Sequence, residues 1–302
     1  MISIPNRAHI LTEQRNPHAT ELHRLDAGGI VALFNRDNHA VLAALESAAP
    51  ALSAFISAIE PGFLRGGRLV YLGAGTSGRL AVLDASEIPP TFQMPADRII
   101  GLIAGGDGSL RRSSEGKEDE PHGAIPELQA LKITADDTVL GIAAGGTTPY
   151  VHGALAWAKS LPHPPHTGML SCAPVPTPPG CDHLIVLPTG AEVVTGSTRL
   201  KAGTATKLAL NTISTALMVR LGKVYGNLMV DVRASNVKLR DRAARIITDL
   251  SDATREEAFA LLDAADGQVK VAVVMRRKQV DADGARTMLA EVQGHLARLL
   301  DQ

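Results

Sequence analysis

Aromatic side chains and net charge are both scarce in this chain of 302 residues. Aromatic residues make up 3% of the sequence, which leaves few platforms on which bases or polysaccharide rings could stack. The formal net charge is -1, so the chain lacks the basic surplus typical of proteins that bind nucleic acid or anionic membranes. We therefore expect a small, polar, charged ligand and no nucleic-acid or membrane partner.

Cysteine is almost absent, with only Cys172 and Cys181. The two could form a disulfide, but nothing in the sequence indicates an oxidising compartment. Together with His163, His166 and His183 they resemble a metal cluster, yet their spacing matches no zinc pattern. We expect no metal and no cofactor.

Long apolar runs and targeting segments are also missing. The N-terminus has no basic segment followed by an apolar core, and no apolar run approaches the roughly 20 residues that span a bilayer. These features are typical of a soluble cytoplasmic protein.

One glycine-rich stretch organises the rest of the chain. The apolar run Leu69–Leu72 ends in glycines, and Thr76 and Ser77 then precede an apolar, helix-like stretch from Leu80. This order predicts a strand, a tight loop at Gly75 and a helix N-terminus. Backbone N–H groups, the helix dipole and two hydroxyls favour an anion there, most often a phosphate.

The same loop contains the pattern G-x-G-x-x-G at Gly73, Gly75 and Gly78, which is weak evidence alone. A dinucleotide site requires an acidic residue about 20 positions on, at the end of the next strand. That distance falls near Pro95–Arg98, and Asp107 comes too late. No Gly-Lys-Ser/Thr follows, so a nucleotide P-loop is also disfavoured. A tight turn without a ligand remains the alternative to a sugar-phosphate site.

Strands that end in glycine recur along the chain and alternate with helical patterns. This alternation predicts a doubly wound, parallel five-stranded α/β sheet. In the flavodoxin-like order 2-1-3-4-5, the first and third strands flank the switch point where ligands bind. The loops after these two strands would then form one phosphate site. Its residues are Thr76 and Ser77 after the first strand and Gly146, Thr147 and Thr148 after the third. The expected strands are Leu69–Leu72, Ile99–Ala104, Thr138–Ala143, Gly168–Ser171 and His183–Leu187.

The flanking regions are expected to be helical. We predict an N-terminal arm with helices over 1–57, a sugar-phosphate-binding domain over 58–235 and a small helical module over 236–302. Thr12–Pro17 is interpreted as a surface arm, because its polar residues alone do not indicate a site. The expected helices are Asn38–Ile59, Tyr150–Lys159, Leu200–Leu221, Asn236–Leu250, Arg255–Ala265, Gln268–Arg276 and Asp283–Leu300.

The segment before Leu200 carries further binding candidates. Ser197 and Thr198 suit the start of a helix. Arg199 and Lys201 would lie in its first turn, where the helix dipole disfavours cations. Their position suggests an anionic ligand or partner, although both side chains could simply reach solvent.

Two acidic segments lie near the expected ligand edge of the sheet. Asp84 and Glu87 are one helical turn apart, and Glu115 follows the glycine loop of the second strand. Burial would raise the pKa of such a carboxyl and make it a usable acid or base. Spacing alone, however, favours a solvated helix end and an exposed acidic loop.

Several long motifs resemble the N-acetylmuramic acid 6-phosphate etherase family. They are Thr12–Pro17, Leu72–Leu80, Leu83–Glu87, Pro89–Phe92, Glu115–Gly116, Glu192, Thr195–Ala205 and Leu221–Asp231. The resemblance implies a sugar-isomerase (SIS) domain, a homodimer and a cytoplasmic enzyme of cell-wall amino-sugar recycling. It implies a carbon–oxygen lyase that removes D-lactate from N-acetylmuramic acid 6-phosphate and adds water, giving N-acetylglucosamine 6-phosphate. It also implies that Glu87 is the proton donor and Glu115 the base at C2.

Two segments depart from the family pattern. Gly145–Thr148 reads Gly-Gly-Thr-Thr where the family usually has Ser-Gly-Arg-Thr, and Ala173 replaces an asparagine. The remaining alternatives are an aldose–ketose sugar-phosphate isomerase and a non-catalytic sugar-phosphate sensor.

The position of Glu87 raises a geometric question. A single helix over 77–87 would place its ends about 15 Å apart. We therefore expect either that this helix ends early or that Glu87 serves the site of a partner chain.

Overall fold

The computed structural model describes residues 6–232 and 236–301. Contacts divide the chain into two compact units, one of residues 1–86 and 97–213, the other of residues 87–96 and 214–302. The predicted domain limits of 1–57, 58–235 and 236–302 stay predictions, and residues 233–235 lie outside the described part.

The first unit contains a parallel five-stranded sheet in the order β2-β1-β3-β4-β5, as the sequence predicts. Its central strands are fully buried, as expected for a sheet that is covered on both faces. The change in strand order places the ends of β1 and β3 side by side, with Gly73 paired to Ile142. The strands are β1 (Leu69–Gly73), β2 (Ile99–Ile103), β3 (Thr138–Ile142), β4 (His166–Ser171) and β5 (His183–Val186).

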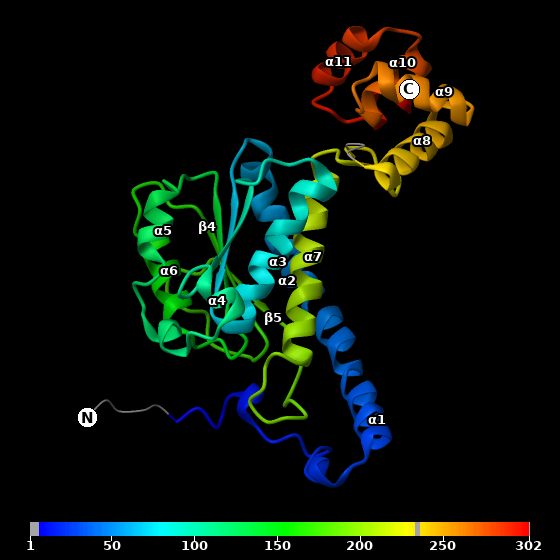
Figure 1. Cartoon of the computed structure of the whole chain (residues 1–302). Coiled ribbons are helices and arrows are strands. Elements are labelled where there is room, and N and C mark those ends of the chain that lie inside the picture. The colour runs from blue at the N-terminus through cyan, green and yellow to red at the C-terminus, as the bar shows by residue number, and fades with distance from the viewer. Residues whose placement is uncertain (1–5, 233–235, 302) are drawn as a thin grey trace. The chain divides into compact units, whose positions relative to one another are not determined.

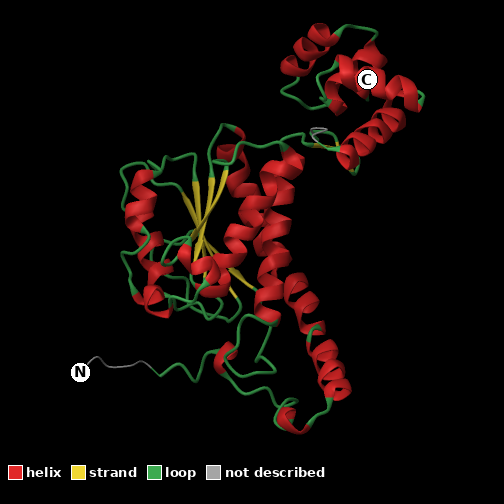
Figure 2. Ribbon diagram, in the orientation of Figure 1, coloured by secondary structure: helices red, strands yellow, loops and turns green. Residues whose placement is uncertain are grey.

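Helices cover both faces of this sheet (Figures 1 and 2). Helices α5 (Ile125–Ala130) and α6 (Pro149–Lys159) lie on one face, and α2 (His39–Leu64) lies on the other. The buried positions of α2, from Val41 to Ile59, recur every three or four residues and pack against β3, β4 and β5. The other helices of this unit are η1 (Leu11–Glu13), η2 (Leu22–Arg24), α1 (Ala27–Asp37), α4 (Gly108–Arg111) and η3 (Glu115–Asp119).

Two long helices contain the segments of most interest. They are α3 (Gly75–Phe92), with Pro89 and Pro90 inside it, and α7 (Lys201–Arg220). Helix α3 is unbroken, so the first of the two expected alternatives, an end before Glu87, is wrong.

Among the described residues, the stretch Ala27–Leu64 is long and apolar enough to cross a membrane by length and composition, and an 18-residue window within it has a mean hydropathy of 1.6. The sequence expectation was that no apolar run approaches roughly 20 residues, and this finding differs from it, because the stretch that α1 and α2 form covers 38 residues. Core helices of soluble proteins pass the same test, and α2 packs its apolar side against the sheet.

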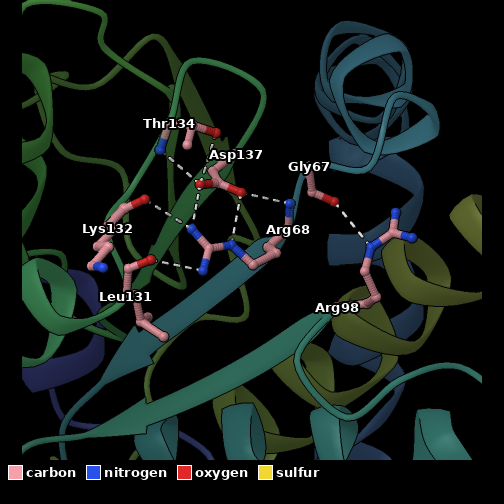
Figure 3. A network of polar contacts seen from close by, with 7 residues as sticks. All are labelled: Gly67, Arg68, Arg98, Leu131, Lys132, Thr134 and Asp137. Carbon is pink, nitrogen blue, oxygen red and sulfur yellow. Dashed lines mark hydrogen bonds and ion pairs between the residues drawn. The ribbon is translucent and has the colours of Figure 1, made fainter.

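A partly buried ion pair, Arg68 with Asp137, fixes the start of β1 to the start of β3 (Figure 3). The carboxylate of Asp137 accepts hydrogen bonds from the backbone N–H and guanidinium of Arg68 and from the N–H and hydroxyl of Thr134. Arg68 also donates to the carbonyl oxygens of Leu131 and Lys132. Burial by itself would raise the pKa of Asp137, but the donors from Arg68 and Thr134 outweigh it and hold this pKa below its usual value.

The free energy of unfolding of the first unit should therefore decrease as the pH falls into the acidic range. A carboxyl with a depressed pKa stabilises the fold above its unfolded value, about 3.9, and loses that contribution as the pH falls through the folded value. At pH 7, Asp137→Asn is expected to lower the free energy of unfolding by about 1.5–3 kcal/mol. Urea unfolding should show this difference narrowing below about pH 4. The exposed neighbour provides a control, since Asp136→Asn should have a small effect at every pH. A difference that stays constant with pH for Asp137→Asn would contradict this account.

The second unit includes a short hairpin, β6 (Val224–Tyr225) with β7 (Leu228–Met229), and a set of helices. Apolar residues of the helices form one core, which includes Ile247, Leu262 and Val273. Lys270, which is 7% exposed, and Lys223 both pair with Asp231 at 2.9 Å and fix the hairpin to α10. The helices are α8 (Val237–Ser251), α9 (Arg255–Ala264), α10 (Val269–Lys278), α11 (Ala282–Glu291) and α12 (Ala297–Leu300).

The expected single helix over Asp283–Leu300 is wrong in one respect. It divides into α11 and α12, because Gln293 and Gly294 take positive φ angles of 55° and 76°. Left-handed backbone of this kind ends a helix.

Candidate functional site

The first glycine loop forms a helix N-terminus that faces open space. Helix α3 begins at Gly75, whose φ is +53°, and half-buried Thr76 and Ser77 lie in its first turn. A Cβ atom at Gly78 would lie 2.6 Å from the carbonyl oxygen of Gly73, so only glycine allows the helix to start this close to β1. The first N–H groups of a helix have no partner within it and can bind an anion.

The loop after β3 has the same character. Gly146 is buried and has a φ of +71°, and a Cβ there would meet the side chain of Val175 at 2.7 Å. Its carbonyl oxygen lies 2.9 Å from Nε2 of His152 in α6. This tight turn places Thr147 and Thr148 immediately before α6, which begins at Pro149.

Both loops line one cavity of about 270 Å³. Its size is close to the lower limit of the roughly 300–1,000 Å³ typical of small-molecule sites. Of the predicted binding residues, Gly75, Thr76, Ser77, Thr147, Thr148 and Thr198 line this cavity. Gly146 and Ser197 each lie next to lining residues and are not themselves part of the wall. The other lining residues are Arg7, Glu13, Ala74, Glu118, Asp119, Ala144, Gly145, Pro149 and Gly196.

Lys201 is not part of the cavity wall. It is 4% exposed, and its Nζ forms an ion pair of 2.9 Å with Oδ1 of Asp37 at the end of α1. The anion that the sequence leads one to expect beside this cation is therefore supplied by the chain itself.

The helix expected over Leu200–Leu221 is confirmed as α7, but the suggested start at Ser197 and Thr198 is wrong, because the helix begins at Lys201. The buried carboxylate of Glu192 accepts hydrogen bonds from the backbone N–H groups of Lys201 and Ala202 and so caps the helix. Burial raises the pKa of Glu192, although these two N–H donors and the charge of Lys201 oppose the shift. A capping residue so far before the helix gives no local signal in the sequence.

Of the predicted acid–base pair, Glu87 and Glu115, the structure describes the side chain of Glu87 alone. Glu87 lies on α3 and is exposed, and the side chain of Glu115 lies outside the described part of the structure. Asp84 is 5% exposed and accepts hydrogen bonds from the hydroxyl of Tyr71 and the amide of Asn211. The interpretation of Asp84 as part of a solvated helix end is therefore wrong.

The N-terminal segment lies at the site, contrary to the expectation of a surface arm. Arg7 and Glu13 line the cavity, while Thr12 and Asn16 are buried. Glu118 and Asp119 of η3 also line it. The run of polar residues before Pro17 was the available signal, but the packing of this segment depends on residues more than 100 positions away.

Both cysteines are free thiols, and burial raises the pKa of Cys172 to about 12. Among residues 6–232 and 236–301, no group of three or more histidine, cysteine, aspartate or glutamate side chains is arranged to hold a metal ion. The protein groups available around the cavity are therefore hydroxyls, backbone amides, carboxylates and one guanidinium.

Comparison with known proteins agrees with this geometry. Residues 51–159 match the family described as the glucokinase regulatory protein N-terminal SIS domain. Together with the sheet order and glycine loops, this match defines the chain as an SIS-domain protein. A solved structure from Escherichia coli CFT073 in complex with A5P is 17% identical, with a TM-score of 0.46, and covers 67% of this chain and 97% of its own.

Full-length relatives are much more similar. The N-acetylmuramic acid 6-phosphate etherase of Gloeobacter violaceus is 50% identical over 99% of this chain and 97% of its own length. The proteins of the same name from Picosynechococcus sp. and Synechocystis sp. are 48% and 47% identical, each over 99% of this chain and 99% and 97% of their own lengths. The chain belongs to the N-acetylmuramic acid 6-phosphate etherase family.

Proposed function

We propose that this protein cleaves the D-lactyl ether of N-acetylmuramic acid 6-phosphate, giving N-acetylglucosamine 6-phosphate and D-lactate, in cell-wall amino-sugar recycling. The observation that carries the proposal is the likeness along nearly the whole chain to etherases, in a protein whose two glycine loops line one cavity. The phosphate is bound by amides and hydroxyls of Thr76 and Ser77 and by Thr147 and Thr148.

The reaction is an elimination followed by a hydration. The aldehyde of the open-chain sugar acidifies the hydrogen at C2, and Glu115 removes that proton. The electron pair forms a double bond between C2 and C3, the C3–oxygen bond breaks, and Glu87 protonates the departing lactyl oxygen. Glu87 then takes a proton from water as the water oxygen bonds to C3, and Glu115 returns its proton to C2. Each carboxyl alternates between acid and base and is regenerated.

The protein acts as a homodimer in this proposal, and Glu87 serves the site of the partner chain. Support comes from the continuity of α3, since residues 77 and 87 of one straight helix lie about 15 Å apart. A cytoplasmic location completes the proposal, and two free thiols fit a reducing compartment. The proposed site needs neither metal nor cofactor.

The proposal is tested by incubating the purified protein with N-acetylmuramic acid 6-phosphate in water labelled with heavy oxygen. We expect unlabelled D-lactate and an N-acetylglucosamine 6-phosphate whose C3 hydroxyl carries the label, because elimination breaks the C3–oxygen bond. Deuterated water should place deuterium at C2. No lactate would remove the proposed activity, and label in the lactate would show that the other carbon–oxygen bond breaks.

A further inference from the structure

The N-terminal segment is fixed to the first unit by a buried asparagine. Asn16 is 6% exposed, and its Nδ2 donates to Oδ1 of Asp37 at 2.9 Å and to the carbonyl oxygen of Ala191 at 3.1 Å. The same Asp37 oxygen accepts a hydrogen bond from the ammonium group of Lys201. The segment is therefore tied directly to the end of α1 and to Ala191 in the loop before α7, and Asp37 in turn holds Lys201 at the start of α7.

The segment also packs against the loop after β3. Thr12 is fully buried, and its Oγ1 lies 3.6 Å from the position that a Cβ would take at Gly145. Ile10, which is 5% exposed, approaches the same position at 3.9 Å. Within the part of the chain that the structure describes, the Thr12 hydroxyl has no hydrogen-bond partner, so packing holds this residue beside a lining residue of the cavity.

Glu13, between these two anchors, is part of the cavity wall. Its Oε2 lies 3.3 Å from where a Cβ would be at Gly196, whose φ is +73°. Glycine at 196 thus leaves the space that the carboxylate uses. In residues 6–232 and 236–301, Glu13 forms no ion pair.

A carboxylate in this cavity could lie beside either the phosphate or the sugar of a bound sugar phosphate. An ionised carboxylate only accepts hydrogen bonds, and a phosphate dianion repels it. The hydroxyl and acetamido N–H groups of the sugar are donors and suit it. The carboxylate therefore matches the sugar, while the hydroxyls of Thr76 and Ser77 match the phosphate.

We propose that the N-terminal segment 10–16 forms the sugar-facing wall of the cavity, and that Glu13 accepts hydrogen bonds from hydroxyl or amide groups of the bound sugar. The inference rests on the proposed function only in taking a sugar phosphate as the occupant. It assigns Glu13 to binding and leaves proton transfer to Glu87 and Glu115.

The test compares two ligands, inorganic phosphate and N-acetylglucosamine 6-phosphate, by titration calorimetry on the full chain. Glu13→Gln should weaken binding of the sugar phosphate about 10–100-fold, the range for a hydrogen bond to a charged group, and change phosphate binding less than about twofold. Asn16→Ala, which loosens the segment, should give the same pattern. The matched control is Glu21→Gln, an exposed glutamate paired with Arg24, which should change neither affinity.

Three results would overturn the inference. Equal weakening of both ligands by Glu13→Gln would indicate a general structural role, and tighter phosphate binding with unchanged sugar-phosphate binding would place Glu13 beside the phosphate. Wild-type protein that binds no sugar phosphate would also overturn it. The failure of the proposed reaction is recognised separately, as wild-type protein that binds the sugar phosphate but releases no D-lactate.

Discussion

Glu87→Gln is expected to lower the rate of D-lactate release by about 10²–10⁴-fold, the contribution typical of one general acid–base group. The amide keeps the shape of the side chain but cannot protonate the lactyl oxygen or activate water. Because Glu87 is exposed on α3, the substitution should leave the thermal unfolding midpoint unchanged. Coupled assay of D-lactate at saturating substrate measures the effect, with Ser86→Ala on the same helix as control. A Glu87→Gln protein with near wild-type turnover would refute the assignment.

Mixing experiments decide which chain Glu87 serves. Glu87→Gln and Ser77→Ala proteins are each expected to have low activity, the second through loss of a phosphate-binding hydroxyl. If the site takes its phosphate loop from one chain and Glu87 from the other, half of the randomly mixed dimers contain one intact site. Activity should then recover to about a quarter of the wild-type value after exchange of subunits. If each chain completes its own site, no recovery occurs.

Lys201→Met should destabilise the first unit by about 3–5 kcal/mol, because it leaves the carboxylate of Asp37 buried without its cation. Only 4% of the Lys201 side chain and 13% of the Asp37 side chain are exposed, so water screens this pair little. The same Asp37 oxygen also accepts a hydrogen bond from Asn16, which the substitution leaves in place. Urea unfolding at pH 7 measures the loss.

Two further variants separate the loss of the pair from general damage. The double variant Asp37→Asn with Lys201→Met should be more stable than Lys201→Met alone, since no unpaired charge is then buried. Arg65→Met breaks the exposed pair with Asp136, where 61% and 43% of the side chains are exposed, and should cost no more than about 1 kcal/mol. A similar cost for Lys201→Met would contradict a stabilising role for the buried pair.

The sequence predicted the sheet well because its signals are local. The first three strands are short apolar runs that lead into glycine-rich loops, and all five predicted strands are found within two residues of their expected limits. The order of strands was also predicted correctly, and it brings the loops with Thr76 and Thr147 to one cavity. These features follow from backbone geometry at glycines and from the burial of parallel strands, and both are visible in the pattern of adjacent residues.

Contacts between distant segments could not be predicted in the same way. Lys201 has the position of a phosphate-binding cation in the sequence, yet its partner is Asp37, and Glu192 rather than Ser197 caps α7. The polar segment before Pro17 has no pattern that distinguishes a free arm from a docked one. Its position depends on Asn16 reaching Ala191 across the fold.

The sequence by itself determined the strand–loop–helix units, their order and the hydroxyls available to a phosphate, since each depends on residues adjacent in the chain. Only the tertiary structure decided which charges neutralise one another and which carboxylates line the cavity. Long side chains such as Lys201 and Glu13 can reach several partners. Folding decides which partner lies close enough for its interaction to offset the free-energy cost of desolvating the charge.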